Sequence, residues 1–430
     1  MASPQILDNI SELSTLFKTV YGPGVEQQQN LTPMAYKKFD VSPIKFGGNS
    51  YEFPARMVNT QSIGARPYRT ALPEPLMNTD VTVRVRHKFI YGTGDITGPD
   101  IEKGKGNPNA FVNTMTDKMH SLTEMILKDL NIQTYLDGTG VRATLAGAPS
   151  SGVTTVDKVK NLRIGMQVNV IKSDGVTIQG GNGDSDTGDS GPYASKRFVI
   201  GAINGSTPSV TFTTSDGSAV SPTSANTNDY IVRHKTVGAE LTGLGAIIDD
   251  GVYNPAANIL QDVDRVASPG WKAKVLSNSG VKRDLTLNLM QNAMDIPEIV
   301  SGRRVDLVLG SYNARDRYLQ LLVPQKRFTD DNLDGGFQKL EYNGRDFLVD
   351  VDCPDDTIWF LNRASIQKFG LFDLAFVEQT GGILKHDSLS AGDVFYFYMR
   401  AICNLGTTQA NANAKIVDIT TDSAYTGAGF

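Results

Sequence analysis

Two strand-like segments separated by a long connection constrain this sequence more than any other feature. Residues 51–57 and 81–86 alternate apolar and polar side chains in the manner of β-strands. The roughly 23 residues between them are rich in Pro, Gly, Asn and Arg, which favour turns and irregular structure. Within one compact domain, a structureless connection longer than about 12–15 residues is uncommon. The pattern therefore predicts a long, protruding hairpin.

The charged residues of this hairpin are candidates for contact with another subunit. Arg56, Arg66 and Arg69 could pair with acidic groups of a neighbour, and Glu74 could pair with basic ones. The alternative is that these side chains are simply solvated on a mobile loop. Both interpretations stay open at the level of sequence.

Composition excludes several classes of protein. The 430 residues are 40% hydrophobic and 20% charged, which is typical of globular domains and is enough for two to four of them. A net charge of -5 argues against a dedicated nucleic-acid binder. Two cysteines and four scattered histidines supply neither a disulfide framework nor a zinc site, so we expect a reducing compartment and no metal.

The first apolar stretch predicts an amphipathic helix. Its apolar side chains recur at helical spacing, whereas Asp8, Glu12 and Lys18 interrupt it and no basic leader precedes it. The apolar positions are Ile6, Ile10, Leu13, Phe17 and Val20. The helix could pack on its own core or dock as an arm on a neighbouring subunit. No run approaches the ~20 apolar residues of a membrane span, so we expect no membrane association.

The longest helical pattern covers residues 109–135. Its apolar stripe consists of Phe111, Met115, Met119, Leu122, Ile126 and Leu130. At 1.5 Å per residue this helix would be ~40 Å long, enough to brace a whole domain. Glu124 and Lys128 are spaced for a stabilising pair on its surface.

The composition changes abruptly at residues 151–236, which are rich in Gly, Ser, Thr and Asp. Short strand-like runs at 166–171, 197–203, 210–214 and 230–233 predict an inserted β domain. The acidic run 180–189 superficially resembles a calcium loop. Ser185 stands where the calcium repeat needs Asp, and Gly188 and Asp189 are in the wrong order for an EF-hand. We therefore expect an exposed loop there.

The rest of the chain predicts mixed α and β structure. A helix is expected over 281–296, a strand over 305–309, and a helix from Tyr312 to Val323 capped by Ser311. A hairpin is expected to turn at Asn343-Gly344 between 337–342 and 347–351. Further strands are predicted at 358–361, 375–385, 394–404 and 415–419.

The sequence contains no catalytic signature that we can identify. Zinc-protease helices, nucleophile elbows, phosphate loops and dinucleotide fingerprints are all absent from it. Acidic pairs such as Asp330-Asp331 and Asp355-Asp356 lie in turn-rich segments, where solvation is the better interpretation. We therefore expect that the protein is not an enzyme and binds no cofactor. An enzyme with an unfamiliar site, and a phage-associated β-rich adhesin or tail protein, stay as alternatives.

Taken in order, these elements resemble the major capsid protein of tailed bacteriophages, the Hong Kong 97-type fold. The residues that carry the resemblance are Glu52-Phe53-Pro54-Ala55-Arg56, Ile63-Gly64-Ala65-Arg66, Tyr91-Gly92, Asp95-Ile96-Thr97-Gly98, Ala110-Phe111-Val112, Leu136-Asp137-Gly138-Thr139-Gly140, Glu240-Leu241-Thr242-Gly243-Leu244, Val305-Asp306-Leu307, Gly335-Gly336-Phe337, Val349-Asp350-Val351-Asp352-Cys353-Pro354 and Ala410-Asn411-Ala412-Asn413-Ala414. Their order and spacing are more specific than any single match.

The resemblance implies an α+β fold with a defined domain order. The expected parts are an N-terminal arm (1–45), an extended loop (46–92), a peripheral domain with the spine helix (93–150), the inserted β domain (151–236), an axial domain with connecting segments (237–370), and return strands of the peripheral domain with a C-terminal tail (371–430).

The resemblance also implies a structural function in the virion. Hexamers and pentamers of the chain would form an icosahedral shell, assembled in the bacterial cytoplasm around double-stranded DNA. A scaffold protein, a portal and a decoration protein are implied partners. Some relatives join subunits by an isopeptide bond from a loop lysine. Because residues 51–86 contain no lysine, and Lys45 and Lys88 lie at the base of the hairpin, we expect a non-covalent shell here.

Overall fold

The computed structural model describes residues 32–43, 48, 50–99, 102, 114–150, 152–185, 191–322, 340–378, 383–386, 393–422 and 425. The chain forms two compact units. The first comprises the described parts of 1–32, 92–126 and 376–399, and the second comprises those of 33–91, 127–375 and 400–430. The helix expected at residues 6–20 lies outside the described residues.

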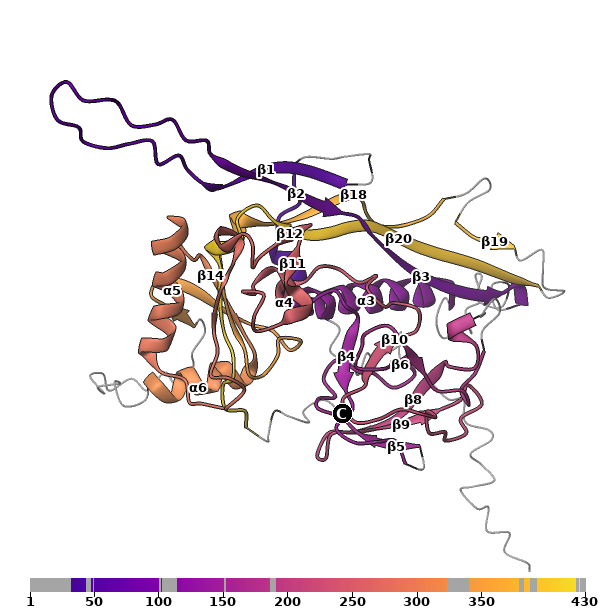
Figure 1. Cartoon of the computed structure of the whole chain (residues 1–430). Helices are drawn as coiled ribbons and strands as arrows, with labels where there is room; N and C mark the ends of the chain where they lie inside the picture. Colours follow the sequence, from indigo (N-terminus) through magenta and orange to yellow (C-terminus); the bar gives the residue numbers. More distant parts are fainter. Residues whose placement is uncertain are drawn as a thin grey trace, which may run out of the picture. The chain divides into compact units, whose positions relative to one another are not determined.

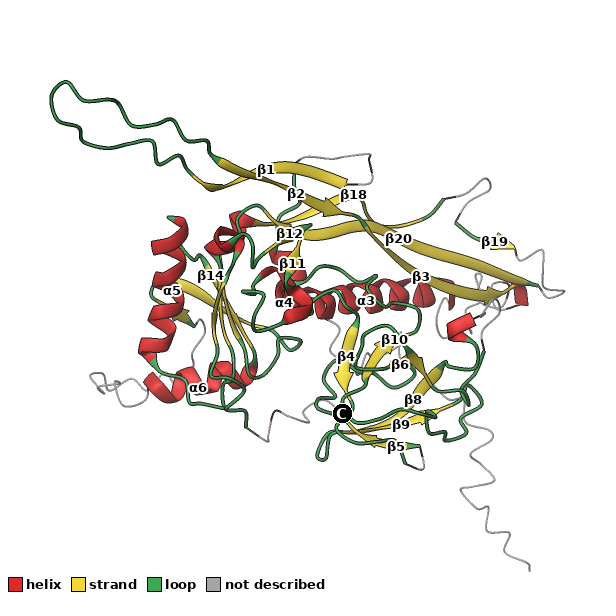
Figure 2. Cartoon of the chain, in the orientation of Figure 1, coloured by secondary structure: helices red, strands yellow, loops and turns green. Residues whose placement is uncertain are grey.

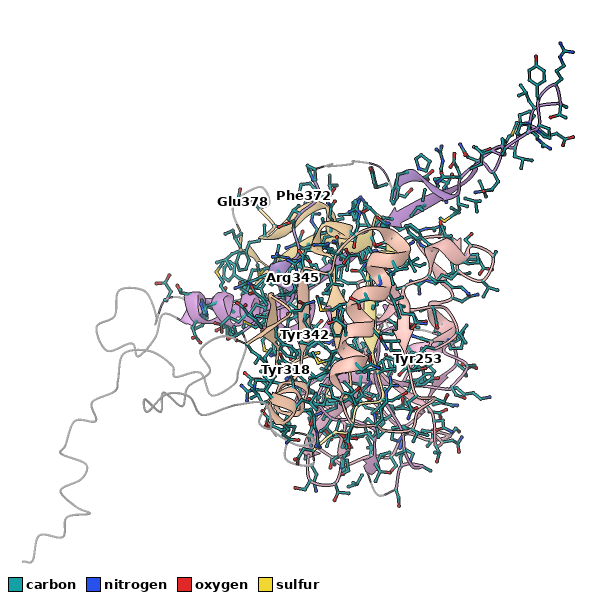
Figure 3. The ribbon with its side chains drawn as sticks, turned by 90° about the vertical axis from the view of Figure 1, so that its left-hand side faces the viewer. Tyr253, Tyr318, Tyr342, Arg345, Phe372 and Glu378 are labelled. Atoms are coloured by element: carbon teal, nitrogen blue, oxygen red, sulfur yellow. The ribbon has the colours of Figure 1, made fainter. Side chains whose placement is uncertain are left out.

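The long hairpin is confirmed. Strand β1 (Ser50–Val58) pairs antiparallel with β2 (Thr79–Arg86), with Tyr51 opposite Val85 and Arg56 opposite Asp80. Residues 59–78 connect the two strands without helix or strand. Figures 1 and 3 show this connection continuing the ribbon of β1 and β2 away from the rest of the second unit.

The first unit is built from one end of the long helix and one end of a four-stranded sheet. Helix α3 (Thr114–Tyr135) confirms the helical prediction from Thr114 onward. The sheet has the order β18-β20-β19, and β3 also pairs with β20. Its strands are β3 (Lys88–Thr97), β18 (Ile366–Phe376), β19 (Lys385–His386) and β20 (Val394–Thr407).

The strand expected at 375–385 is wrong in position. The observed strand β18 begins at Ile366 and ends at Phe376. Ile366 and Phe369 are buried, so apolar positions that precede the expected start are the ones that fix this strand in the core. The strand expected at 394–404 is confirmed and extends to Thr407.

The Gly- and Ser-rich region forms an antiparallel sheet with its own core. The path runs β4-β10-β6-β8-β9-β5, with β7 beside β6. Its strands are β4 (Val141–Thr144), β5 (Val153–Thr155), β6 (Gln167–Ile171), β7 (Ile178–Gln179), β8 (Phe198–Asn204), β9 (Ser209–Thr213) and β10 (Tyr230–Arg233). Phe198 and Phe212 pack edge to face at the centre, with ring centroids 5.9 Å apart. We call this the inserted sheet.

A second sheet, which we call the mixed sheet, combines parallel and antiparallel pairs in the order β13-β21-β17-β14-β16-β15. Its strands are β13 (Lys274–Leu276), β14 (Leu307–Gly310), β15 (Glu341–Tyr342), β16 (Arg345–Val349), β17 (Ile358–Leu361) and β21 (Ala414–Ile416). Helices α5 (Leu287–Ser301) and α6 (Tyr312–Leu322) pack on it (Figure 2). Tyr318 contacts Tyr342 edge to face, with centroids 5.7 Å apart (Figure 3).

Local sequence explains where these elements begin and turn. The Ser311 hydroxyl accepts a hydrogen bond from the Ala314 amide, as expected for a helix cap. Asn343 and Gly344 both have positive φ, at 49° and 69°, which confirms the tight hairpin turn. The helix expected from Val281 begins only at Leu287. Arg283 forms a parallel β-bridge with Ile419, and Thr286 caps the N-terminus of the helix.

Short elements complete the described fold. They are η1 (Tyr36–Lys38), η2 (Gly191–Tyr193), α4 (Leu244–Ile247), η3 (Pro255–Ala257), β11 (Ile259–Leu260), β12 (Val263–Asp264), η4 (Pro269–Trp271), η6 (Arg363–Ser365) and η7 (Ala410–Ala412). Among the described residues, no helix combines the length and apolar character that crossing a membrane requires.

Replacing Phe360 by alanine tests the core of the mixed sheet. Phe360 is fully buried, so its truncation leaves a cavity and should lower the free energy of unfolding by about 3–5 kcal/mol. Phe372→Ala is the matched control: that ring is 50% exposed, and its loss should cost at most about 0.5–1 kcal/mol. Urea unfolding measures both. Equal decreases in the free energy of unfolding for the two variants would contradict this packing.

Candidate functional site

The base of the hairpin is anchored on the core of the second unit by one apolar face. Val83 and Val85 are fully buried, and Phe53, Ala55 and Met57 pack against the hydrophobic core cluster that contains Val83. The Tyr51 ring stacks on Phe369 of β18, with centroids 5.4 Å apart. Because side chains alternate along a strand, the opposite face of β1 and β2 remains on the surface.

Ion pairs cover that outer face. Arg56 pairs with Asp80 at 2.9 Å, and Arg84 pairs with Glu52 at 2.6 Å, both across the two strands. The hydrogen bond from Arg56 lowers the pKa of Asp80, and the one from Arg84 lowers the pKa of Glu52. All four groups are exposed, so each pair contributes little to stability but favours this register.

A tight turn holds the hairpin at its base. Gln261 and Asp262 link β11 to β12 with positive φ angles of 53° and 64°. The Gln261 carbonyl accepts a hydrogen bond from the Arg84 amide at 2.9 Å. Asp262 pairs with Arg86 at 2.7 Å and with Arg84 at 3.4 Å. This turn therefore helps to fix the direction of β2 relative to the rest of the second unit.

The tip of the hairpin, residues 59–78, is exposed and carries several large apolar side chains. Met77 and Tyr68 are 95% and 88% exposed, and Ile63, Leu72 and Leu76 are also exposed. The contacts that the tip does make are internal: Thr60 donates its amide to Asn78 at 2.8 Å and its hydroxyl to the Leu76 carbonyl at 2.8 Å. Apolar side chains gathered on a solvated loop mark a surface that binds another molecule.

The structure places the four predicted contact residues in two groups. Arg56 lies on β1 and is already paired with Asp80, so it is part of the ribbon rather than of the free tip. Arg66, Arg69 and Glu74 all lie on the exposed tip. The Arg69 guanidinium covers the Tyr68 ring, 5.3 Å from its centroid.

The predicted stripe of the long helix is described in part. Phe111 lies outside the described residues, and of Met115 only the backbone in α3 is described. Met119 and Leu122 are half-buried, whereas Ile126 and Leu130 are buried. A side chain at Gly92 would collide with Ile126, its Cβ falling 2.3 Å from the Ile126 Cδ1, so glycine lets β3 lie close to this face.

The C-terminal half of α3 carries a buried ionic network that sequence reasoning missed. The Lys128 ammonium lies 3.0 Å from Asp352, so the expected pairing of Lys128 with Glu124 is wrong. Glu124 instead lies 3.6 Å from His120. Asn131 donates to Asp350 and to Asp352, and the Tyr135 hydroxyl donates to Asp350 at 2.9 Å. Burial raises the pKa of Asp352 above its usual value.

The network continues to the inserted sheet through Arg142 on β4. Its guanidinium is fully buried and pairs with Glu240 at 2.6 Å and with Asp129 at 3.0 Å. Burial raises the pKa of Glu240, against the opposing effect of Arg142. At Asp129, burial raises the pKa, but Arg142, Arg233 and the hydrogen bond from Gln133 outweigh it, so the pKa is lowered. One arginine thus joins α3, β4 and the segment before α4.

The same network holds the segment that precedes the hairpin. The Ala35 amide donates to Asp350 at 3.0 Å, and the Tyr36 amide donates to Asn131 at 3.0 Å. The Lys368 ammonium lies 4.8 Å from the centre of the Tyr36 ring, and residues 41 and 368 form a parallel bridge. Residues 35–42 are therefore fixed on the second unit.

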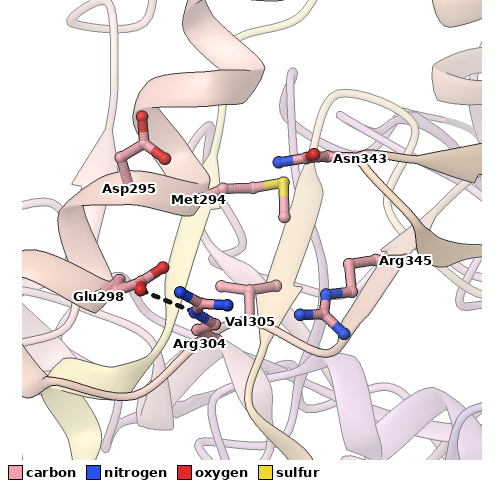
Figure 4. A pocket seen from close by; sticks show the side chains of 7 residues that line it. All are labelled: Met294, Asp295, Glu298, Arg304, Val305, Asn343 and Arg345. Atoms are coloured by element: carbon pink, nitrogen blue, oxygen red, sulfur yellow. Dashed lines mark hydrogen bonds and ion pairs between the residues drawn. The ribbon is translucent and has the colours of Figure 1, made fainter.

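The described residues give little support for metal binding, thiol chemistry or acid–base catalysis. His, Cys, Asp and Glu side chains do not gather there in groups of three that could hold a metal ion. Cys353 and Cys403 are both buried. The pocket in Figure 4 contains Asp295 and Glu298, but Asp295 accepts a hydrogen bond from Gln291 and Glu298 pairs with Arg304 at 2.8 Å.

Comparison with solved structures identifies the fold. A chain of the Cyanophage A-1(L) capsid matches with a TM-score of 0.60 at 12% identity, over 96% of this chain and 100% of that one. The capsid of a native GTA particle matches with a TM-score of 0.52 at 9% identity, over 98% and 100%. The chain has the Hong Kong 97-type capsid fold.

The Hong Kong 97-type fold accounts for both the hairpin and the spine helix that the sequence predicted. The capsid of an empty GTA particle also matches, with a TM-score of 0.51 at 9% identity, over 96% of this chain and 100% of that one. No protein-family model matches the sequence. No curated protein matches it either. The likeness is therefore one of fold, carried by the order and packing of the elements.

Replacing Arg142 by methionine tests the buried network. The change leaves Glu240 and Asp129 without their shared partner, so we expect the free energy of unfolding to fall by about 3–5 kcal/mol. Arg304→Met is the control, because it breaks the exposed pair with Glu298 and should cost at most about 1 kcal/mol. Chemical unfolding followed by circular dichroism compares them. A loss below about 1 kcal/mol for Arg142→Met would refute the importance of the network.

Proposed function

We propose that this chain is the structural subunit of a tailed-phage head. Many copies form hexamers and pentamers that close into an icosahedral shell around double-stranded DNA. The observation that carries the proposal is the hairpin, whose apolar side chains at the tip are exposed in the single chain and whose base packs on the core of the second unit. The shared fold with the capsid chains of Cyanophage A-1(L) and of GTA particles supports it.

The parts of the chain take roles that follow from this proposal. The extended loop (46–92) and the arm (1–45) reach neighbouring subunits, and the spine helix braces the peripheral domain (93–150 and 371–430). Strands β13 to β17 of the mixed sheet, with α5 and α6, belong to the axial domain (237–370), which meets its copies at the capsomer centre, and β21 completes this sheet from the segment 371–430. The inserted β domain (151–236) lies on the outer surface, where a decoration protein could bind it.

The proposal gives the protein no catalytic role and no cofactor. Its partners are further copies of itself, a scaffold protein and a portal, and it is located in the virion after assembly in the bacterial cytoplasm. With a net charge of -5, the chain has few basic residues to spare for a lining that grips DNA. Retention of the genome then rests on closure of the shell.

Removing the hairpin tip tests the proposal. Residues 59–78 are replaced by Asn-Gly, a turn that joins two antiparallel strands directly. Because the described contacts of the tip are internal, the circular dichroism spectrum and melting temperature should stay close to those of the full chain. Shells seen by negative-stain electron microscopy should disappear.

A point variant controls for nonspecific effects of losing apolar surface. Val176→Ser removes a side chain that is 77% exposed in the turn between β6 and β7, and it should leave shell formation unchanged. Global unfolding of the tip deletion would show that the segment belongs to the chain's own core. Normal shells from the deletion would contradict the proposed function of the hairpin.

The shell is predicted to be non-covalent. An isopeptide bond needs an amine nucleophile, and arginine stays protonated at any workable pH, so the arginines of the lysine-free hairpin cannot replace one. Particles boiled in detergent under reducing conditions should therefore give one band on a denaturing gel, near 46.5 kDa or at a trimmed size. A ladder of multimers would show covalent linkage and would point to Lys45 or Lys88.

A further inference from the structure

A surface groove in the second unit lies close to the base of the hairpin. It is lined by Val252, Ile296 and Val300, by the lysines Lys272 and Lys274, and by Asp250, and it encloses about 280 Å³. Val252 and Val300 are 69% and 60% exposed, so the groove has an apolar wall that nothing within the described chain covers.

The charges of the groove are unbalanced in favour of positive charge. Lys272 and Lys274 make no ion pair with any described residue. The Asp250 carboxylate already accepts hydrogen bonds from the amides of Val252 and Tyr253, at 2.9 and 2.8 Å. The groove is therefore suited to an acidic group flanked by apolar side chains.

One segment of this same chain has that chemistry. Leu72-Pro73-Glu74-Pro75-Leu76 lies on the hairpin tip, and Glu74 is the sole acidic residue of the sequence from 59 to 78. Leu72 and Leu76 are 84% and 58% exposed on either side of it. The two prolines restrict the backbone to extended geometry, so little conformational entropy is lost when the segment binds.

The position of the groove indicates that the segment comes from a second copy. Gly270 of η4, two residues before Lys272, packs against Met57 on β1, so the groove lies beside the hairpin base. Glu74 precedes the start of β2 by five residues, which is up to ~17 Å along an extended chain, and the tip continues the ribbon away from the rest of the second unit (Figures 1 and 3). A contact between the tip of one copy and the base of the next is heterologous, and its repetition forms a ring where the rotation between copies closes.

The pocket between α5 and β16 is a poorer choice for the tip. It contains Asp295 and Glu298, which could attract Arg66 and Arg69, but both acids are already engaged and Arg304 and Arg345 line the same pocket (Figure 4).

We propose that the groove formed by Val252, Ile296, Val300, Lys272 and Lys274 binds the Leu72-Pro73-Glu74-Pro75-Leu76 segment of a neighbouring copy, with Glu74 paired to the two lysines. This inference rests on the proposed function and names the surface through which the subunits join. Leu72 and Leu76 cover the apolar wall, and the carboxylate of Glu74 neutralises the excess positive charge.

Charge exchange in the full-length protein tests the pairing. Glu74→Lys should raise the protein concentration needed for assembly about tenfold, because a like charge then faces Lys272 and Lys274 in every subunit. Lys272→Glu with Lys274→Glu should have a similar effect. Combining all three changes should restore assembly. Lys172→Glu, an exposed lysine of the inserted sheet, is the matched control and should assemble normally.

Carbodiimide crosslinking tests the contact without requiring closed shells. This reagent joins a carboxylate directly to an amine that touches it. In a mixture of isotopically labelled and unlabelled protein, mass spectrometry should detect peptides that link Glu74 of one copy to Lys272 or Lys274 of another, and Glu74→Gln should abolish them. Normal shells from Glu74→Lys together with no such crosslink would overturn the docking alone. A wild-type chain that never associates would overturn the proposed function, and this inference with it.

Discussion

The buried ionic network on the C-terminal half of α3 is the constraint on which the second unit depends. Lys128, Asp129 and Asn131 lie on one helix and bind groups from the loop after β16 and from β4, and Arg142 of β4 binds Glu240 in the segment before α4. Charges removed from water must be paired, so displacing any one of these elements would leave a buried charge without its partner. The network thereby fixes where the hairpin, the inserted sheet and the mixed sheet leave the helix.

Sequence periodicity predicted those elements whose apolar residues face one side. The hairpin strands alternate, α3 has a stripe, and Asn343-Gly344 supplies the positive φ angles that its turn requires. The buried network could not be predicted in this way, because Lys128 and Asp352 look like solvated residues until the fold brings them together. Likewise, the pattern at 281–296 is helical in spacing, but pairing of Arg283 with the strand end near Ile419 delays the helix to Leu287.

The predicted contact residues show the same limit. Position along the hairpin was sufficient to place Arg66, Arg69 and Glu74 on an exposed tip. It was not sufficient to show that Arg56 is occupied by Asp80, because that pairing depends on the register of β1 against β2. Nor does the sequence reveal that Lys272 and Lys274 share a groove with α5, since the two regions meet only in the folded chain.

The central claim is that the exposed apolar side chains at the hairpin tip, which extends from an anchored base, bind another copy of the chain. Electron microscopy of the purified full-length protein across a range of concentrations, with and without a scaffold protein, tests it most directly. The account predicts ring-shaped capsomers and closed shells whose subunits are joined through the hairpins. A protein that stays strictly monomeric at high concentration under both conditions would contradict it.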